Sequence, residues 1–207
     1  MAKKKATGLA AKIKKIITRE WEPDPSLLLH ENIPKPLHGL APRTVLGSAW
    51  WNKERRECYA SCNFHCAACG VHKKNAKLRQ WLEAHETYEI NYQKGIAKYI
   101  KAVPLCHCCH CFIHDGRLQA LLDQGKLNHG KYLTIITHGE EVLSRAGLVR
   151  PPHAEREARI EELAVNGKLA DWGDWRLQIG RKKYEPLYSS EEEWLKAYSE
   201  KFDEEDS

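Results

Sequence analysis

Residues 104–114 read PLCHCCHCFIH, which places four of the chain's eight cysteines and three of its eleven histidines in one short stretch. Residues 66–70 read CAACG and lie about forty positions earlier. Each stretch contains a Cys-x-x-Cys pair, a tight turn that points successive backbone N–H groups at the sulfur atoms. Two such pairs are typical of one tetrahedral zinc site. These two stretches therefore decide the fold that the sequence predicts.

The second stretch allows two pairings of its cysteines. A pair at 106 and 109 is followed at once by His110 and then by His114, whereas a pair at 108 and 111 has no histidine at the matching offsets. We therefore choose the first pairing. The expected zinc ligands are Cys66, Cys69, Cys106 and Cys109. The remaining cysteines are expected to be free thiols small enough to be buried, namely Cys58, Cys62, Cys108 and Cys111.

The distribution of the cysteines also indicates the compartment. All eight fall between Cys58 and Cys111, among histidines, whereas a disulfide framework would spread them to join distant loops. No apolar run approaches the roughly 20 residues that cross a bilayer, and no long apolar segment follows the N-terminal lysines as in a signal peptide. We expect a soluble protein of the cytoplasm, with no membrane partner and an oligomeric state that the sequence does not set.

Charge is unevenly distributed along the chain. Residues 3–19 hold seven Lys or Arg and no acid, whereas residues 191–206 hold eight acids and two lysines. Removing that acidic tail from the net charge of +5 leaves +11 on the rest of the chain. A basic body suits a polyanionic partner such as DNA, although a solvated arm and a solubilising tail would give the same composition.

Hydrophobic spacing predicts the elements before and around the core. A basic amphipathic helix is expected from about residue 6 to 21, where it could lie on DNA, on a membrane surface or on the protein itself. A proline-rich extended connector follows to residue 42, and then a helix over 43–59. Short strands are expected on either side of His85, and a helix is expected to contain both His110 and His114.

The remainder of the chain reads as mainly helical. Helices are expected over 118–122, 132–146 and 155–165, a strand over 175–179, and a last helix over 191–201 opened by a capping box of Ser190 and Glu193. The fold class is therefore α+β. We divide the chain into a basic helix and connector (1–41), a zinc core with its following helices (42–150) and a C-terminal extension with the acidic tail (151–207).

The core motifs resemble a known family. Cys66-x-x-Cys69, then Ala-His85-Glu86, then Leu-Cys106-x-x-Cys109-His110-x-x-x-His114 resembles an HNH endonuclease of the group that holds zinc with four cysteines, as found in bacteria and phages. The resemblance covers about fifty residues, between about Cys66 and His114, and implies a small ββα-metal fold in which a structural zinc joins a hairpin to a helix. It also implies that His85 is the general base and that His110 and His114 face a catalytic metal.

The sequence departs from the family pattern at two positions. Lys101 stands where the family usually has the middle Asn of the HNH motif, and Ala84 replaces the acid that usually precedes the base. Both departures bear on how His85 would be oriented.

The residue types fit phosphodiester hydrolysis on chemical grounds. The reaction needs a proton acceptor and a Lewis acid that neutralises the charge developing on the phosphate. Neutral histidine is abundant near pH 7 and suits the first task, while helix-borne imidazoles such as His110 and His114 accept Zn²⁺, Mn²⁺, Ni²⁺ or Mg²⁺. Glu86 could be a further ligand or could orient a water molecule.

Plainer interpretations stand beside these assignments. His85 could be a structural histidine of the hairpin, with His65, His72 or His107 in its place, and His110 and His114 could only support the zinc site. The cations expected to contact phosphate could equally be a solvated face; they are Lys12, Lys14, Lys15, Lys73, Lys74 and Arg79.

Three functions follow from these readings. The first is a metal-dependent DNA endonuclease, and the second is a non-catalytic zinc module that binds nucleic acid or protein. The third, a zinc deaminase, is disfavoured because Leu105 separates Pro104 from the Cys-x-x-Cys pair and because His85-Glu86 is not a His-x-Glu motif.

Overall fold

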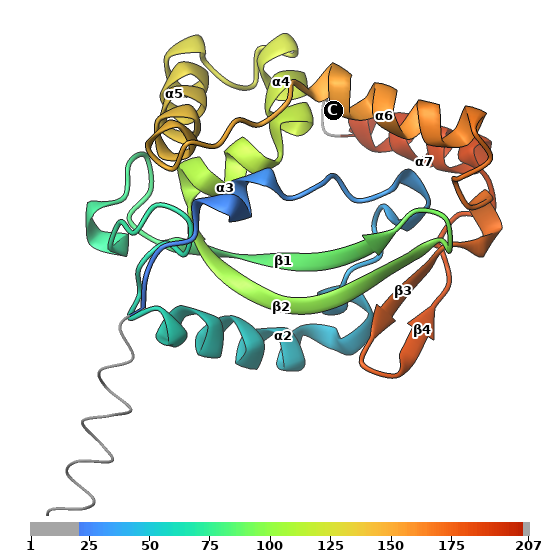
Figure 1. The fold of residues 1–207 in the computed structure, drawn as a ribbon, viewed down its shortest axis with the longest axis horizontal. Helices are drawn as coiled ribbons and strands as arrows, with labels where there is room; N and C mark the ends of the chain where they lie inside the picture. Colours follow the sequence, from blue (N-terminus) through green and yellow to red (C-terminus); the bar gives the residue numbers. More distant parts are fainter. Residues whose placement is uncertain (1–20, 205–207) are drawn as a thin grey trace, which may run out of the picture.

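The computed structural model describes residues 21–204, with side chains as far as Tyr198. A four-stranded sheet in the order β1-β2-β3-β4 lies between helix α2 on one side and helices α3 to α6 on the other (Figure 1). The expected α+β class is confirmed. The expected N-terminal helix and the cations Lys12, Lys14 and Lys15 lie outside the described residues.

A long antiparallel hairpin forms half of the sheet. Strand β1 (Leu82–Asn91) pairs with β2 (Ile96–Cys106), and His85 faces Val103 across the pair. The prediction of two short strands flanking His85 was wrong, because one continuous strand runs through this residue. A register shift between Thr87 and Tyr88 marks a β-bulge, which breaks the regular two-residue alternation that a strand shows in sequence.

The C-terminal part of the chain completes the sheet. Strand β3 (Arg176–Ile179) pairs in parallel with the start of β2, and β4 (Lys182–Tyr184) pairs antiparallel with β3. The expected strand over 175–179 is therefore confirmed, while β4 has no counterpart among the predicted elements. Gly95 in the hairpin turn has a φ of +61°, and a Cβ there would lie only 2.9 Å from Ala170. Because glycine has no Cβ, the turn can pack closely against the segment that leads into β3.

Strand β2 runs directly into helix α3 (His107–Ile113), with Cys106 as the last strand residue and the helix N-cap. His114 is the C-cap of α3 and has a non-helical backbone (φ −90°, ψ 44°), so the helix expected to contain both His110 and His114 ends just before the second. A new helix, α4 (Asp115–Asp123), begins at the next residue.

The other helices fall close to the predicted ranges. Helix α2 (Pro42–Ser61) is kinked at Gly47, which has a φ of +83°. The remaining helices are α5 (His129–Arg145), α6 (His153–Val165) and α7 (Glu191–Glu204), with short 3-10 turns at Pro25–Leu29 (η1), Lys35–Leu37 (η2), Lys73–Asn75 (η3) and Trp172–Asp174 (η4). At the start of α7 the Ser190 hydroxyl accepts from the Glu193 N–H, while the Glu193 carboxylate accepts from the backbone of Ser189. Within the described residues no helix is both long and apolar enough to cross a membrane.

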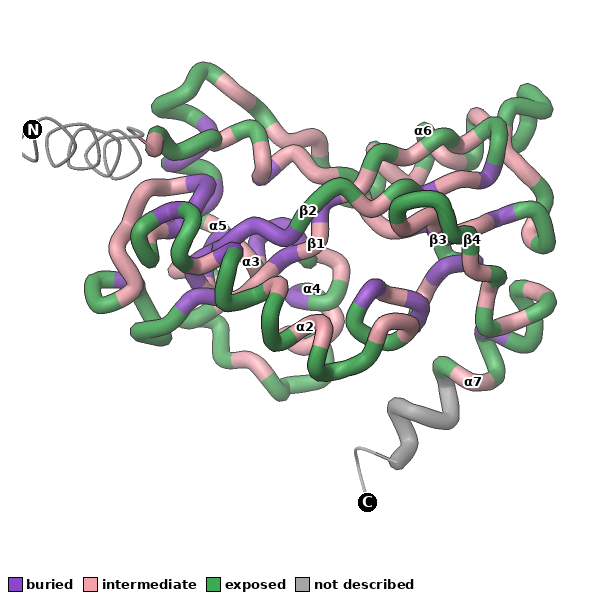
Figure 2. The backbone as a smooth tube through the Cα atoms, turned by 90° about the horizontal axis from the view of Figure 1, so that it is seen from below, coloured by how far each residue is buried: buried purple, intermediate pink, exposed green. Residues whose placement is uncertain are grey.

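Two clusters of buried side chains stabilise this arrangement. The larger surrounds the junction of β2 with α3 and α5, and includes Leu105, Phe112 and Ile135, together with Leu28 from η1. Figure 2 shows the buried residues concentrated along β1, β2 and α3. The smaller cluster lies at the other end of the sheet around Trp175. The larger cluster thus encloses the segments that carry the cysteine and histidine motifs.

Candidate metal centres

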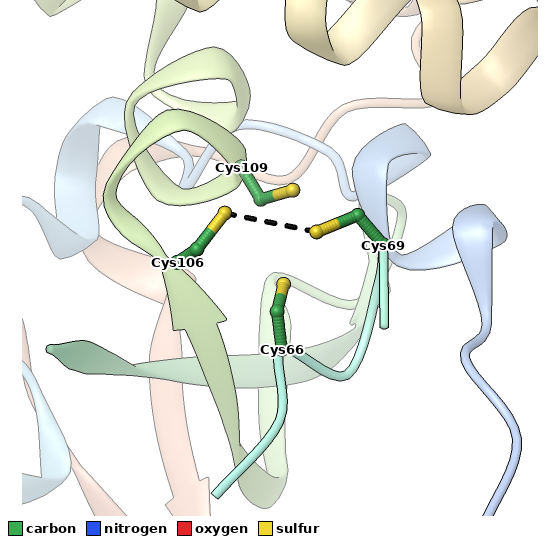
Figure 3. Close-up of side chains that lie close together, drawn as sticks. All are labelled: Cys66, Cys69, Cys106 and Cys109. Carbon is green, nitrogen blue, oxygen red and sulfur yellow. Dashed lines mark hydrogen bonds between the residues drawn. The ribbon is translucent and has the colours of Figure 1, made fainter. Parts of the chain in front are cut away.

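Four cysteines converge where β2 meets α3. The sulfur atoms of Cys66, Cys69, Cys106 and Cys109 all lie within 4.8 Å of one another (Figure 3). The Cys69 and Cys106 sulfurs are 3.8 Å apart, far beyond the length of a disulfide bond. Four thiolates placed about 2.3 Å from a central zinc at tetrahedral angles would be separated by about 3.8 Å. The donor set and its spacing therefore fit a zinc ion.

The loop that carries the first pair is held by its backbone. The Cys66 N–H donates to Val71 O and the Gly70 N–H donates to Cys66 O, which closes the turn. Gly70 has a φ of +78°, a conformation that favours glycine. The Ala67 N–H donates to Pro104 O at 2.7 Å, and this bond joins the loop to β2 two residues before Cys106. The two Cys-x-x-Cys pairs are thereby brought together.

The remaining cysteines lie outside this group, as expected. Cys108 and Cys58 are buried, and burial raises the pKa of the Cys108 thiol to about 11 and that of Cys58 to about 12. Cys111 sits beside His107, 3.6 Å from its ring nitrogens. The structure therefore brings Cys106 and Cys109, and not Cys108 and Cys111, to the first cysteine pair, as the sequence predicted.

Helix α5 contributes a histidine that sequence reasoning missed. The Nε2 atom of His138 lies 3.4 Å from the Cys109 sulfur and 3.8 Å from the Cys106 sulfur. An N–H at this position can donate to a thiolate and so reduce its negative charge. His138 lies 29 residues beyond Cys109, in a helix with no sign of metal chemistry in its sequence. No spacing rule could have identified it.

A second convergence involves three histidines. One ring nitrogen from each of His85, His110 and His114 lies within 4.8 Å of the other two, and the ring centroids are 4.7 to 5.5 Å apart. His85 projects from β1, His110 from α3, and His114 from the C-cap of that helix. The four-residue spacing puts the last two on one side of the helix, and the packing of α3 on β1 brings His85 to them.

His85 is the buried member of this group. It is 4% exposed, and neither ring nitrogen has a hydrogen-bond partner within the described residues. Burial lowers the pKa of His85 well below its usual value, and the nearby His114 and His30 lower it further. A neutral imidazole with unpartnered nitrogens is the form that ligates a metal ion.

Glu83 organises the helix side of this centre. One carboxylate oxygen lies 2.6 Å from His107 Nδ1 and the other lies 2.8 Å from His110 Nδ1. Burial alone would raise the pKa of Glu83, but the hydrogen bonds from His110 and His107 lower it to about 2. The bond to Nδ1 leaves the Nε2 atom of His110 as its free ligand atom, an arrangement common at metal-bound histidines. Sequence reasoning did not single out Glu83.

Two further groups surround His85 on its other side. The His30 ring lies 5.2 Å from that of His85, and its Nε2 accepts the Tyr88 N–H at 3.0 Å. Arg150 has a side chain only 4% exposed and donates to the carbonyls of His30 and Ile113. Burial lowers the pKa of Arg150 to about 10, so it stays charged at neutral pH. It fixes the connector that carries His30 against the end of α3.

Glu86 does not belong to either convergent group of the described residues. Neighbouring residues of a strand point to opposite faces, so Glu86 points away from the face that carries His85. Its carboxylate keeps one buried oxygen without a partner, and burial raises its pKa. Lys101, which stands where the HNH pattern usually has Asn, is exposed, and its carbonyl accepts from the Thr87 hydroxyl.

The alternative histidines and the expected cations lie outside the group formed by His85, His110 and His114. His65 and His72 pair with each other, with ring centroids 4.9 Å apart, and His107 is engaged by Glu83. Lys74 and Arg79 are exposed and Lys73 is half-buried, all in the loop between the first cysteine pair and β1.

In comparisons with known proteins, no family model, no curated protein and no solved structure matches this chain.

Proposed function

We propose that this protein is a metal-dependent endonuclease of the HNH type, which hydrolyses DNA phosphodiester bonds on a zinc-stabilised ββα-metal core. The observation that carries the proposal is the convergence of His85, His110 and His114 beside a four-cysteine cluster at the same strand–helix junction. The hairpin and the helix that follows it at once carry both groups, so one group can stabilise the fold while the other carries out the chemistry.

The two sites would hold different ions. The four thiols suit a structural zinc, which would contribute directly to folding. The three imidazoles suit a divalent ion such as Zn²⁺, Mn²⁺, Ni²⁺ or Mg²⁺, which when bound supplies a Lewis acid for the scissile phosphate. Glu83 holds His110 in the orientation that this site requires.

The geometry favours a ligand role for His85 over the base role that the family resemblance implies. Its nitrogens lie among those of His110 and His114, and burial leaves them no other partner. Glu86, the next residue along β1, points to the opposite face of the strand, so its position gives no support to a role as proton acceptor at this ion. A ligand role and a base role for His85 predict different effects of mutation, so experiment can separate them.

A second candidate function is a zinc module that binds nucleic acid or protein without cleaving it. Lys101 favours this alternative, because an exposed lysine stands in place of the family's Asn. The same experiment decides between the two functions.

The test uses the purified full-length protein with supercoiled plasmid, with and without EDTA, and with added Mg²⁺, Mn²⁺ or Ni²⁺. We expect nicking that EDTA abolishes and one tightly held zinc per chain by elemental analysis. His110→Ala should abolish nicking while the zinc is retained, and His129→Ala should change nothing, because His129 is exposed at the start of α5 and belongs to neither site.

Two variants then assign the roles on β1. His85→Ala should weaken binding of the second ion, seen by Ni²⁺ titration, and excess metal should partly restore nicking. Glu86→Gln is the matched control on the opposite face of the strand, and it should leave ion binding and nicking nearly unchanged. If His85→Ala keeps normal ion binding yet loses nicking, His85 is the base after all. A wild-type protein that binds both ions and DNA but never nicks would establish the non-catalytic module.

A further inference from the structure

The loop of residues 63–81, between α2 and β1, is cationic and exposes apolar side chains. It carries four Lys or Arg and no acidic residue. Trp81 is 52% exposed, Leu78 45% and Phe64 41%. Three large hydrophobic side chains of this one short segment therefore face solvent. Positive charge beside exposed aromatic rings is typical of surfaces that bind single-stranded nucleic acid.

Each exposed ring in the loop is paired with a cation. The Arg79 guanidinium lies 5.3 Å from the centre of the Trp81 ring, and Lys73 Nζ lies 4.4 Å from that of Phe64. Both rings nevertheless keep a large exposed surface. An indole with an arginine beside it offers a flat apolar area for a base and a charge for the adjoining phosphate.

The backbone of the loop is strained at the positions that present these groups. Within the described part of the chain, the non-glycine residues with positive φ are Asn63, Phe64 and Leu78, and all three lie in this loop. At Leu78 (φ +65°) the Arg79 N–H donates to Lys77 O at 2.8 Å, which makes a tight turn just before Trp81. Such strain persists where the surrounding structure enforces it, and it is concentrated at functional sites.

A chain of contacts connects Trp81 to the histidine centre. Arg79 lies beside Trp81 and 3.8 Å from the carboxylate of Glu83, which in turn binds His110. Trp81 lies just before β1, and Glu83 and His85, which share one face of that strand, both contact α3. At about 3.3 Å per residue, Trp81 begins roughly 13 Å along the strand from His85.

We propose that Trp81 and Arg79 form a stacking platform for an unpaired base beside the histidine centre, so that the protein acts on single-stranded or locally unpaired nucleic acid. This inference rests on the proposed nuclease function for its biological sense, but the platform itself needs only binding. A duplex keeps its bases stacked on one another and would offer Trp81 only its phosphates and sugars, whereas an unpaired strand exposes base faces.

The test measures binding by the full-length, zinc-loaded protein with no other divalent ion present, so that no cleavage is required. The probes are a fluorescein-labelled oligothymidylate and a labelled duplex of equal length, followed by fluorescence anisotropy. Trp81→Ala should weaken binding of the single strand by roughly 5- to 150-fold, since a base–aromatic stack is worth about 1–3 kcal/mol. Duplex binding should change little. Trp81→Phe should retain most of the affinity.

Two controls secure the interpretation. Leu195→Ala removes an exposed apolar side chain on α7, at the opposite side of the molecule from this loop (Figure 1), and should leave both affinities unchanged. Adding oligothymidylate should quench tryptophan emission in the wild type, and most of this quenching should be missing in Trp81→Phe.

The proposal is overturned if the wild type binds no single strand, if Trp81→Ala binds it as tightly as the wild type, or if Trp81→Ala weakens duplex binding equally. It is also overturned if quenching persists in Trp81→Phe. None of these outcomes depends on the plasmid assay. Failure of the nuclease function and failure of the platform can therefore be told apart.

Discussion

Glu83 supports the histidine centre without itself being a candidate ligand. Its two oxygens bind His107 and His110 at 2.6 and 2.8 Å, and its pKa of about 2 keeps it ionised throughout the range in which the protein would work. An ionised acceptor at Nδ1 fixes the ring and increases the basicity of the opposite nitrogen.

Replacing Glu83 by glutamine should therefore weaken the histidine centre and leave the cysteine cluster intact. We expect divalent-ion affinity at the histidines to fall by about 10- to 100-fold, the usual effect of losing such a partner. Titration with Ni²⁺ measures this affinity, and elemental analysis of the protein measures the zinc bound by the four cysteines. Glu89→Gln is the matched control, because Glu89 lies on the same strand but is exposed and pairs only with Lys98 at the surface. If the wild type and Glu83→Gln bound the ion with equal affinity, Glu83 would have no role in supporting the histidine centre.

At the scale of elements, the packing of α5 against α3 holds the second cysteine pair in place. Gly139 of α5 is buried, and a Cβ at this position would collide with the ring of Phe112 on α3. The close approach also brings His138, the neighbouring residue, to the sulfur atoms of Cys106 and Cys109. A glycine is thus required at 139 for a packing reason.

Gly139→Ala should lower the free energy of unfolding by about 1–3 kcal/mol, the typical cost of overpacking a core. Thermal unfolding followed by circular dichroism gives the change. The control is Gly130→Ala in the same helix, where the nearest atom to a new Cβ is 3.5 Å away in Asn128. That substitution should be neutral or stabilising, since alanine favours helix by up to about 1 kcal/mol over glycine. If the Gly139→Ala variant were as stable as the Gly130→Ala variant, the tight contact between α3 and α5 would be contradicted.

The elements also mark where sequence reasoning succeeds and where it does not. The two cysteine pairs and the pair of His110 and His114 were predictable, because spacing along a turn or a helix directly sets which side chains meet. His85 was expected at the site only through the family resemblance, and it reaches the other two histidines by the packing of α3 on β1. Strand β1 was predicted as two pieces, because the bulge at Thr87 and Tyr88 disrupts the alternation by which a strand is recognised. Strand β4 has only three residues, and its two lysines are exposed, so it leaves no hydrophobic pattern.

The missed site residues share a physical cause. Glu83 and His138 reach the centres through tertiary packing, and His30 reaches His85 from a connector 55 residues earlier in the chain. Such contacts depend on how the elements are placed relative to one another, and no local periodicity encodes that placement.

At the scale of the whole molecule, one buried cation ties distant segments to the strand–helix junction. Arg150 donates to carbonyls of the connector and of α3, and Asp115 lies 3.7 Å from its Nε. Asp115 also binds Arg156 at 2.6 Å, which joins α4 to α6. The helices after the core are thus attached to the same junction that carries both candidate metal centres.

Charge distribution gives the last prediction at this scale. Residues 1–190 carry a net charge of +11 and the following segment carries −6, so a polyanion would be attracted to the body and repelled by the tail. Deleting residues 1–15 removes six lysines. If these contact phosphate, binding should weaken for every DNA sequence alike, because the counterions that they displace are no longer released.

The measurement is DNA affinity over a series of salt concentrations. Each lost phosphate contact should reduce the slope of log K against log[salt] by about 0.9 for duplex and about 0.7 for a single strand. The matched control removes negative charge from the acidic tail. Changing Glu191, Glu192 and Glu193 to Gln leaves the N-terminal lysines intact and should strengthen binding at low salt with little change in slope. If the protein without residues 1–15 kept the wild-type slope, these lysines would not contact the DNA. The basic loop at residues 73–79 would then have to supply the phosphate contacts beside the histidine centre, and its variants should carry the salt dependence instead.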